Sequence, residues 1–509
     1  MTNNPSDHMV ILSPGAVTLT QLRDIWRGAA VDLLASAWPA IDASAEAVLR
    51  IVGSGRTVYG INTGFGLLAQ TRIPDDQLLD LQRNLILSHS CGLGDALEPR
   101  IVRLVMTLKV IGLGRGHSGV RRQVVAQLVA MLAADLLPVI PAQGSVGASG
   151  DLAPLAHLAA AMLGEGDALL GGERMTAADA LSRAGLEPLV LGPKEGLALI
   201  NGTQVSTAIA LDALFKGENV IATAIVASAM SLDAFKGTDA AFDPRIHEVR
   251  GQPGQIAVAA AMKQLLEGSA VRASHEGCDR VQDPYSFRCQ PQVTGAALDL
   301  LRQVARTLTI EANAVTDNPI IFGDDGVSGG NFHAQPVAFA ADMIAMALCE
   351  VGSISERRTA VLIDPKMSLL PPFLIENSGV NSGFMIAQVA AAALVSENKS
   401  LAFPASVDSI PTSAGQEDHV SMATHAACKA GRIVGNAAGV IGIELLAAAQ
   451  GLDFHLPLRS SATLSAIHDR IRAVVPHLGK DRLMAPEIDW ARSASVDGCF
   501  AADLPDLIQ

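Results

Sequence analysis

The sequence contains few aromatic and few charged residues. Aromatic side chains make up 4% of the 509 residues and charged ones 17%, whereas hydrophobic residues reach 49%, with alanine prominent among them. Small apolar residues that form helices readily favour closely packed helices over an aromatic-rich β-sandwich. The composition therefore predicts a soluble, mostly α-helical protein.

Basic residues are also scarce. The chain has 37 Lys and Arg against 51 Asp and Glu, which gives a formal net charge of −14. Nucleic-acid backbones and anionic membranes both attract clustered positive charge. We therefore expect neither nucleic acid nor a membrane as a partner.

Segments that direct a chain out of the cytoplasm are not evident either. The longest clean apolar run, residues 220–232, is shorter than the roughly 20 residues that span a bilayer. The beginning, MTNNPSDHMV, lacks the basic and apolar regions of a signal peptide. Six scattered cysteines have no CxxC or zinc-like spacing, so we expect buried free thiols, no metal and a cytoplasmic location.

Hydrophobic periodicity predicts several helices. Apolar residues recur at helical spacing over 101–108, 125–136 and 298–308, and residues 337–354 are apolar around most of a helix. A helix that is apolar on all sides is buried on all sides. Since the chain has several such segments, we expect some to be buried against other subunits of a homo-oligomer.

The glycine-rich stretch GSVGASGDLAPLAH, residues 144–157, follows two of these predicted helices. A nucleophile elbow needs a glycine two residues after Ser149, where Asp151 stands, and a P-loop needs a lysine that is absent. One interpretation is a helix-to-helix turn capped by Asp151.

A second interpretation is self-modification of Ala148-Ser149-Gly150. Gly150 has no side chain to block attack of its backbone nitrogen on the Ala148 carbonyl, and Ser149 can lose its hydroxyl as water. Two dehydrations leave a five-membered imidazolone with an exocyclic methylidene. That ring is an electrophile, which none of the twenty side chains supplies.

This tripeptide in its context resembles the self-processing site of the aromatic amino acid ammonia-lyases, whose prosthetic group is 4-methylidene-imidazole-5-one (MIO). The resemblance covers nearly the whole chain, in the ordered blocks TVYGINTGFGLLAQTR from Thr57, LQRNLILSHSCGLG from Leu81, KEGLALINGTQVSTA from Lys194, DPYSFRCQPQV from Asp283, EANAVTDNPI from Glu311, SGGNFHAQPVA from Ser328, GVNSGFMIAQVAAAALVSENK from Gly379 and TSAGQEDHVSM from Thr412.

The resemblance implies an all-α fold of the fumarase and aspartase type, with a central bundle of long helices. It implies an N-terminal helical region, residues 1–200, that carries the MIO loop at 144–154, and a region 201–509 with the bundle and a polar C-terminal part. It also implies a homotetramer whose active sites are shared between subunits, and an MIO formed by the chain itself with no diffusible cofactor.

The family's reaction removes ammonia from an amino acid, which requires a base for the β-proton. By resemblance Tyr59 is that base, although a phenol with a reference pKa near 10 needs a lowered pKa or a coupled acceptor. Arg288 matches the residue that pairs with the substrate carboxylate. The residues that match the lining of the MIO and the substrate pocket are Asn201, Gln282, Tyr285 and Phe332.

Two positions bear on the substrate. Ser88-His89 matches the histidine-type pair, where phenylalanine-type relatives carry Phe-Leu and tyrosine-type relatives His-Leu. Glu417 stands where phenylalanine-type relatives carry an amide, and a carboxylate there can pair with an imidazole or act as a second acid or base. We therefore expect L-histidine as substrate and urocanate as product, and whether Tyr59 or Glu417 takes the proton stays open.

Other possibilities remain at this point. A phenylalanine or tyrosine lyase or aminomutase of the same family would share the MIO, a fumarase-type lyase would leave Ser149 unmodified, and a silent helical scaffold would turn over nothing. Three positions depart from common family choices: Gly415 stands for the Asn of NQEDH, and Phe287 and Gln335 differ conservatively.

Overall fold

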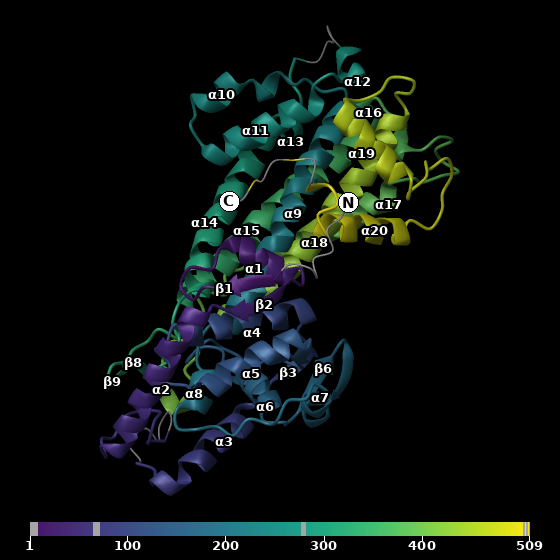
Figure 1. Cartoon of the computed structure of the whole chain (residues 1–509). Helices are drawn as coiled ribbons and strands as arrows, with labels where there is room; N and C mark the ends of the chain where they lie inside the picture. The colour runs from purple at the N-terminus through teal and green to yellow at the C-terminus, as the bar shows by residue number, and fades with distance from the viewer. Residues whose placement is uncertain (1–8, 65–71, 276–280, 502–503, 505–506, 508–509) are drawn as a thin grey trace. The chain divides into compact units, whose positions relative to one another are not determined.

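The computed structural model describes residues 9–64, 72–275, 281–501, 504 and 507 (Figure 1). Part of the block TVYGINTGFGLLAQTR, which begins at Thr57, and Cys278 lie outside the described residues. The chain packs into two compact units, each assembled from three stretches. Unit 1 consists of residues 1–212, 306–342 and 404–428, and unit 2 of residues 213–305, 343–403 and 429–509. The predicted division at residue 200 stays a prediction.

Unit 1 contains the N-terminal helices and every described strand. Its helices are α1 (Leu19–Trp26), α2 (Trp38–Gly53), α3 (Leu78–His89), α4 (Pro99–Gly114), α5 (Arg122–Ala133), α6 (Leu152–Met162), α7 (Ala177–Arg183) and α8 (Glu195–Ile200). The strands are short: β1 (Met9–Leu12) pairs in parallel with β2 (Ala30–Leu33), and the antiparallel sets are β3 (Leu93–Ala96) with β5 (Pro141–Gln143), β4 (Leu136–Pro138) with β6 (Asp167–Leu170) and β7 (Glu173–Thr176), and β8 (Ile320–Phe322) with β9 (Asp325–Val327).

Four long helices contribute residues to both units. They are α9 (Gln204–Ala234), α14 (Gln290–Ala312), α15 (Gln335–Ile363) and α18 (Ala423–Asp453). The remaining helices of unit 2 are α10 (Pro244–Glu248), α11 (Pro253–Leu266), α12 (Ala270–Ala273), α13 (Tyr285–Arg288), α16 (Pro365–Ser368), α17 (Met385–Leu401), α19 (Ala462–Arg472) and α20 (Ala485–Val496). The prediction of an all-α fold with long helices is confirmed.

Helix α4 is the buried centre of unit 1. Pro99 occupies its first turn, where no backbone donor is lost, and every residue from Leu104 to Gly114 is buried. Helices apolar on all sides are enclosed by other elements, and α4 packs against α1, α2, α5 and β4. The helix therefore forms a fixed part of the core of unit 1, from which Lys109 reaches the end of α8.

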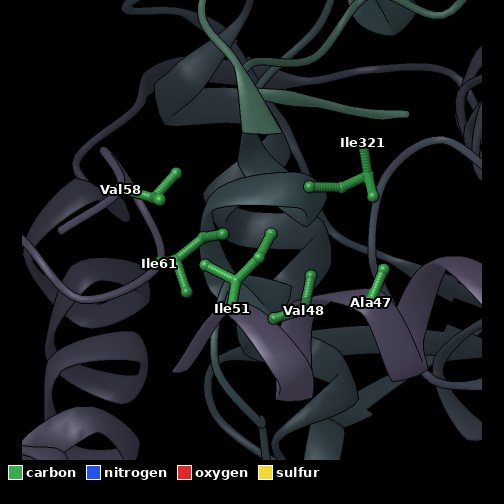
Figure 2. Close-up of a cluster of buried hydrophobic side chains, with 6 residues drawn as sticks. All are labelled: Ala47, Val48, Ile51, Val58, Ile61 and Ile321. Carbon is green, nitrogen blue, oxygen red and sulfur yellow. The ribbon is translucent and has the colours of Figure 1, made fainter. Parts of the chain in front are cut away.

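A small apolar cluster fixes the turn that carries Tyr59. Ala47, Val48 and Ile51 of α2 pack against Val58 and Ile61 of the turn and against Ile321 of β8, and all six are at most 9% exposed (Figure 2). Burial of such side chains contributes roughly 1.5–3 kcal/mol each. Tyr59 lies between two of the anchored residues.

Two details of the sequence analysis need correction. The predicted helical stripe over 125–136 ends at Ala133, because Leu136 belongs to strand β4, which pairs with Leu170 of β6. The five described cysteines are free thiols, but Cys91 and Cys499 are exposed, so the expectation that all cysteines are buried is wrong. The stripe over 298–308 lies in α14, and Leu298, Leu301, Ala305 and Leu308 are at most 2% exposed.

Two helices are long and apolar enough to cross a membrane by length and composition. In α15 and α18 the most apolar windows are 67% and 89% buried inside the structure, as in core helices of soluble proteins. Some apolar side chains of α15 and α17 are nevertheless exposed. They are Phe339 and Met346 on α15 and Ile386 and Val389 on α17.

Candidate active site

The glycine-rich loop joins β5 to α6 and rests on the turn after α8. Gly150 has φ +75°, and a Cβ built on it would lie 2.3 Å from the carbonyl oxygen of Gly202. Gly150 and Gly202 form a parallel bridge, and the Asp151 amide donates to the Gly202 carbonyl at 2.8 Å. Only glycine fits at residue 150, both for its left-handed backbone and for this close approach.

The side chain of Asn201 addresses the central residue of the tripeptide. Its Nδ2 donates to the Ser149 carbonyl oxygen at 2.5 Å, while its buried Oδ1 has no hydrogen-bond partner among the described residues. In an MIO, the Ser149 carbonyl becomes the carbonyl of the ring. The donor, the bare Gly150 and the small buried Ala148 therefore fit the group that the sequence predicts, and Asn201 is the residue that would hold its oxygen.

Asp151 does not cap the helix that it precedes. It occupies the position before α6 without a side-chain hydrogen bond to that helix. Its Oδ2 instead accepts from the amide and hydroxyl of Ser206 in the first turn of α9, at 2.8 and 2.9 Å. Its Oδ1 accepts from Ser145 and Thr424, at 3.0 and 2.6 Å. The simple capped turn is therefore wrong in its detail, because Asp151 ties the loop to α9 and α18.

Helix α8, which ends at Ile200 just before Asn201, is held at its first turn by side chains from other elements. Gln82 of α3 accepts from the amides of Gly196 and Leu197, at 2.9 and 3.3 Å. Glu195, 1% exposed, accepts from the Arg121 guanidinium, with the shortest contact 2.6 Å. Amides in the first turn of a helix lack partners within the helix, so Gln82 supplies their acceptor, while the Glu195 ion pair ties the start of α8 to Arg121.

Lysines hold both ends of the same helix. Lys194, just before α8, pairs with Asp317 at 2.9 Å. Lys109 of α4 donates to the backbone carbonyls of Ala198 and Asn201, at 3.1 and 2.9 Å. Burial lowers the pKa of Lys109 to about 7, against the opposing influence of the Asp317 and Asp151 charges.

The segment before α18 also packs against the loop. Val420 and Met422 form a buried cluster with Ala148. The Met422 amide donates to the Val146 carbonyl at 2.9 Å, and the Ser421 hydroxyl donates to the Gly147 carbonyl at 3.1 Å. This segment follows directly after Glu417, so the fold brings Glu417 to the neighbourhood of the tripeptide.

Glu417 is half-buried, and its backbone bridges to Thr412. Its Oε2 is buried and accepts no hydrogen bond from a described residue. An unpaired buried carboxylate oxygen costs free energy unless a partner arrives. Glu417 Oε2 can therefore accept a hydrogen bond from a ligand.

The turn that precedes Glu417 explains the departure noted at residue 415. Ser413, Ala414 and Gly415 all have positive φ, at +49°, +56° and +88°. Glycine adopts this backbone without strain, and asparagine is among the few other residues that tolerate it. Gly415 and the Asn of NQEDH thus satisfy the same backbone requirement.

Ser88 and His89 end helix α3. The Ser88 hydroxyl donates to the Leu85 carbonyl at 3.1 Å and lies 3.0 Å from His89 Nδ1. His89 is half-buried, and burial lowers its pKa while the Leu85 carbonyl acts in the opposite direction. The imidazole is accordingly neutral near neutral pH, when it has one donor and one acceptor nitrogen.

Two contacts hold the segment after His89 alongside the glycine-rich loop. Strand β3 pairs with β5, so that Leu93 faces Gln143, the residue before the loop. The Gly92 amide donates to Nε2 of His157 on α6, the helix after the loop, at 3.1 Å. The predicted selectivity pair and the predicted electrophile therefore lie in adjoining segments of unit 1.

Tyr59 and Phe332 are half-buried in unit 1. Gly60 packs so closely on α8 that a Cβ would lie 2.3 Å from Leu197 Cδ2, which places the Tyr59 turn beside the helix that precedes Asn201. Next to Phe332, the ring of His333 stacks on His419 at 5.7 Å. His419 comes two residues after Glu417.

Gln282, Tyr285 and Arg288 belong to unit 2. Gln282 is exposed, Tyr285 is 70% exposed, and Arg288 is half-buried with its guanidinium 4.4 Å from the Tyr285 ring centroid. Arg288 donates to the Asp283 carbonyl at 3.1 Å and forms no ion pair with a described residue. Its guanidinium therefore keeps donors available for a carboxylate.

A buried ion pair supports the short helix that carries these two side chains. Arg358 of α15 and Glu444 of α18 are fully buried and joined by contacts of 2.5 and 2.7 Å. The remaining Arg358 nitrogen donates to Gln290 Oε1 at 2.8 Å and to the Ser286 carbonyl at 3.3 Å. Ser286 lies in α13, between Tyr285 and Arg288.

The sequence analysis did not single out Lys109, Gln82 or Thr424. Lys109 directly follows the predicted apolar stripe over 101–108, and a charge at that place, with Val110 and Ile111 after it, was the signal that could have identified it. Gln82 and Thr424 stand in ordinary polar positions, and only the packing assigns them their contacts.

The class of protein is indicated by three features: a largely helical fold, a loop with the sequence Ala-Ser-Gly, and an asparagine amide that donates to the carbonyl of the central serine. Residues 17–473 match the family model of aromatic amino acid lyases, and the chain therefore belongs to that family.

Solved structures agree with this assignment. The chain is similar to histidine ammonia-lyase from Trypanosoma cruzi, with 42% identity, a TM-score of 0.89 and coverage of 98% of this chain and 96% of that one. It is also similar to tyrosine aminomutase from Streptomyces globisporus (34%, 0.92, 97% and 98%) and to Pantoea agglomerans phenylalanine aminomutase (28%, 0.91, 96% and 99%). Because these relatives differ in substrate, the substrate has to be argued from the site's own residues.

Proposed function

We propose that this protein is an ammonia-lyase that converts L-histidine to trans-urocanate and ammonia, the first step of histidine degradation. The observation that carries the proposal is the buried Oε2 of Glu417, which accepts no hydrogen bond within the described chain. An imidazole N–H supplies the missing donor. A phenyl ring cannot, so a phenylalanine substrate would leave the carboxylate unpaired.

His89 is the second residue that we assign to the imidazole. Because Ser88 occupies Nδ1, the neutral ring offers Nε2 to a partner of the same chemistry, as donor or acceptor according to its tautomer. Its pKa is lowered by burial, so it does not add a positive charge to the pocket near neutral pH. Ser88 orients the ring through the contact with Nδ1.

We assign the reaction to residues as follows. Tyr59 takes the β-proton, with Glu417 as the alternative base, and Arg288 binds the substrate carboxylate. An MIO formed by Ala148, Ser149 and Gly150 would supply an electrophilic carbon that makes the amine a better leaving group. Asn201 stabilises negative charge on the Ser149 carbonyl oxygen, and Gln282, Tyr285 and Phe332 line the pocket.

The assembly that we propose is a cytoplasmic homotetramer with shared active sites. Gln282 and Tyr285 are exposed on unit 2, as expected of residues that complete a site with another subunit. Apolar side chains exposed on α15 and α17, among them Met346 and Ile386, provide surface for subunit packing. Size-exclusion chromatography with light scattering tests the tetramer.

One experiment tests the electrophile and the substrate separately. Mass spectrometry of the peptide with residues 148–150 reports the electrophile, and ultraviolet absorbance of urocanate reports turnover of L-histidine. We expect a peptide lighter by two waters and formation of urocanate. A lighter peptide without urocanate contradicts the substrate, and an unmodified peptide contradicts the mechanism.

Tyrosine is the competing substrate with a specific rationale, because its phenol could also donate to Glu417. L-Tyrosine and L-phenylalanine therefore serve as parallel substrates, with both the unsaturated acid and the β-amino acid measured. Glu417→Gln should reduce kcat/KM for histidine by about 10–100-fold. Equal turnover of histidine and tyrosine by the wild-type protein would overturn the assignment of Glu417 and His89 to the substrate imidazole.

A further inference from the structure

Unit 1 contains two lysines that are almost completely buried, and their environments differ. Lys194 pairs with the carboxylate of Asp317 at 2.9 Å. Lys109 is 1% exposed and forms no ion pair with a described residue. Its Nζ donates only to the backbone carbonyls of Ala198 and Asn201. A buried ammonium is costly, so a lysine without a paired carboxylate calls for an explanation.

The two carbonyls belong to the end of α8. This helix has six residues, and its last carbonyls have no amide of the helix to accept from. A cation at that end satisfies them and complements the negative end of the helix. Lys109 therefore determines where α8 ends and how Asn201, the residue that follows, is oriented.

Asn201 contacts the tripeptide through its side chain. Lys109 holds the Asn201 carbonyl at 2.9 Å, and the Asn201 amide donates to the Ser149 carbonyl at 2.5 Å. One residue further, the Gly202 carbonyl accepts from the Asp151 amide at 2.8 Å. Two of the loop's contacts thus depend on a turn that Lys109 anchors to the rigid helix α4.

We propose that Lys109 is a positioning residue for the self-modification of Ala148-Ser149-Gly150. By anchoring the Asn201–Gly202 turn, it keeps a hydrogen-bond donor on the Ser149 carbonyl while the tripeptide reacts. This inference rests on the proposed function, because it concerns how the same electrophile forms.

The reaction needs that donor at one identifiable moment. A bond forms between the Gly150 nitrogen and the Ala148 carbonyl carbon, and the Ala148 oxygen leaves as water with the hydrogens of the Gly150 and Ser149 backbone nitrogens, which leaves a C=N bond between the Ala148 carbon and the Ser149 nitrogen. Ser149 then loses its α-hydrogen and its hydroxyl as a second water. No electrons are gained or lost overall, so neither oxidant nor reductant is required. When the α-hydrogen leaves, negative charge develops on the Ser149 carbonyl oxygen, which is the atom that Asn201 addresses.

The test measures maturation of the full-length chain rather than activity alone. Lys109→Met and Lys109→Gln are expressed, and the fraction of the 148–150 peptide that is lighter by two waters is followed over time. We expect the variants to mature at least tenfold more slowly than the wild-type chain. In the matured fraction we expect kcat to fall while KM for histidine changes little, because the substrate pocket keeps its residues. Lys109→Arg, which retains a cation and several donors, should restore part of the rate.

Leu104→Ala is the matched control for loss of stability. Leu104 lies on the same helix and is fully buried, but its side chain has no group that could form a hydrogen bond with the Asn201 turn. Its thermal midpoint should fall while maturation proceeds at the normal rate. If Leu104→Ala slows maturation as much as Lys109→Met at a similar midpoint, Lys109 acts through stability and the proposal is wrong.

A double variant tests the connection to Asn201. If Lys109 acts by holding that turn, Lys109→Gln should slow maturation less in an Asn201→Ala background than in the wild-type chain, because one of the two contacts that depend on the turn is already lost. Additive effects would contradict the proposal, as would normal maturation of both Lys109 variants. Failure of the wild-type chain to mature would instead contradict the proposed function, so the two failures are distinguishable.

Discussion

The amide of Asn201 donates to the Ser149 carbonyl at 2.5 Å, and the two residues are 52 positions apart in the chain. The bond joins the turn after α8 to the loop before α6, and the parallel bridge between Gly150 and Gly202 lies directly beside it. The central residue of the predicted electrophile is thus held by a polar side chain, and its neighbour is held by backbone alone.

Removing that donor should impair the chemical step. We expect Asn201→Ala to lower kcat by about 10²–10³-fold, the usual effect of losing one donor to a developing oxyanion, with a smaller effect on KM. Steady-state kinetics normalised to the matured fraction measures this. Asn331→Ala is the control, because the Asn331 amide donates to the Val315 carbonyl in an exposed loop. A kcat within twofold of the unmodified protein would show that the bond has no role in the reaction.

Adding one methyl group at Gly150 should prevent maturation. In Gly150→Ala the new Cβ would meet the Gly202 carbonyl oxygen at 2.3 Å, so the loop has to leave its place on the turn. Gly166→Ala is matched in backbone, since Gly166 also has φ +75° but nothing within 4 Å of the new Cβ. Both variants incur roughly 1–2 kcal/mol of backbone strain, and peptide mass should separate them. Normal dehydration in Gly150→Ala would contradict the described packing of the loop.

Breaking the buried ion pair of unit 2 should destabilise the protein. Arg358→Met leaves the Glu444 carboxylate buried without its cation, which costs about 3–5 kcal/mol. Because Arg358 also holds the Ser286 carbonyl, KM should rise as well. Urea unfolding and kinetics test the two effects. The double variant Arg358→Met with Glu444→Leu should recover most of the stability, and failure to recover it would argue against the pair as the cause.

Asp453 should make stability depend on acid pH. Burial by itself raises its pKa, but hydrogen bonds from His468 and His477 and the charge of Arg472 outweigh burial and lower the pKa to about 2. A carboxyl group with a lowered folded pKa stabilises fully above its unfolded pKa near 4, and that contribution disappears as the pH falls toward about 2.

Asp453→Asn should therefore cost about 2 kcal/mol at about pH 7, and the cost should shrink at about pH 3. Urea unfolding at both pH values checks this. Asp489→Asn is the control, because Asp489 pairs with Arg492 at the surface, where both side chains are at least half exposed, and exposed pairs contribute about 0–1 kcal/mol. A pH-independent difference for Asp453→Asn would contradict the role of its ionisation.

Much of the fold could be predicted from local pattern. The stripe over 298–308 and the enclosed character of 101–108 reflect a helical repeat that is visible without any tertiary information. The stripe over 125–136 was extended too far, because a short strand such as Leu136–Pro138 contains too few residues to interrupt a helical repeat of apolar side chains. Burial of individual cysteines was not predictable, since Cys91 follows a helix end whose exposure depends on its neighbours.

The candidate site was predictable in its residue types and only partly in its contacts. Ala148, Ser149 and Gly150 carry their chemistry in adjacent positions, so the sequence alone suggests the electrophile. The position of Glu417, and the pairing of the Asn201 amide with the Ser149 carbonyl, depend on segments that meet only after folding. The same holds for Asp151, whose carboxylate serves α9 and α18 rather than the helix that it precedes.

By itself, the sequence determined the helical class, and it predicted the self-reacting tripeptide and the polar residues expected at the substrate, because each depends on residue type or on short-range spacing. Tertiary structure decided which groups hold that tripeptide. Lys109, Gln82 and Asp151 obtain their roles from carbonyls and amides of distant segments, and a backbone group carries no signature of its own in the sequence. Only packing brings such a group within hydrogen-bond distance of one particular side chain.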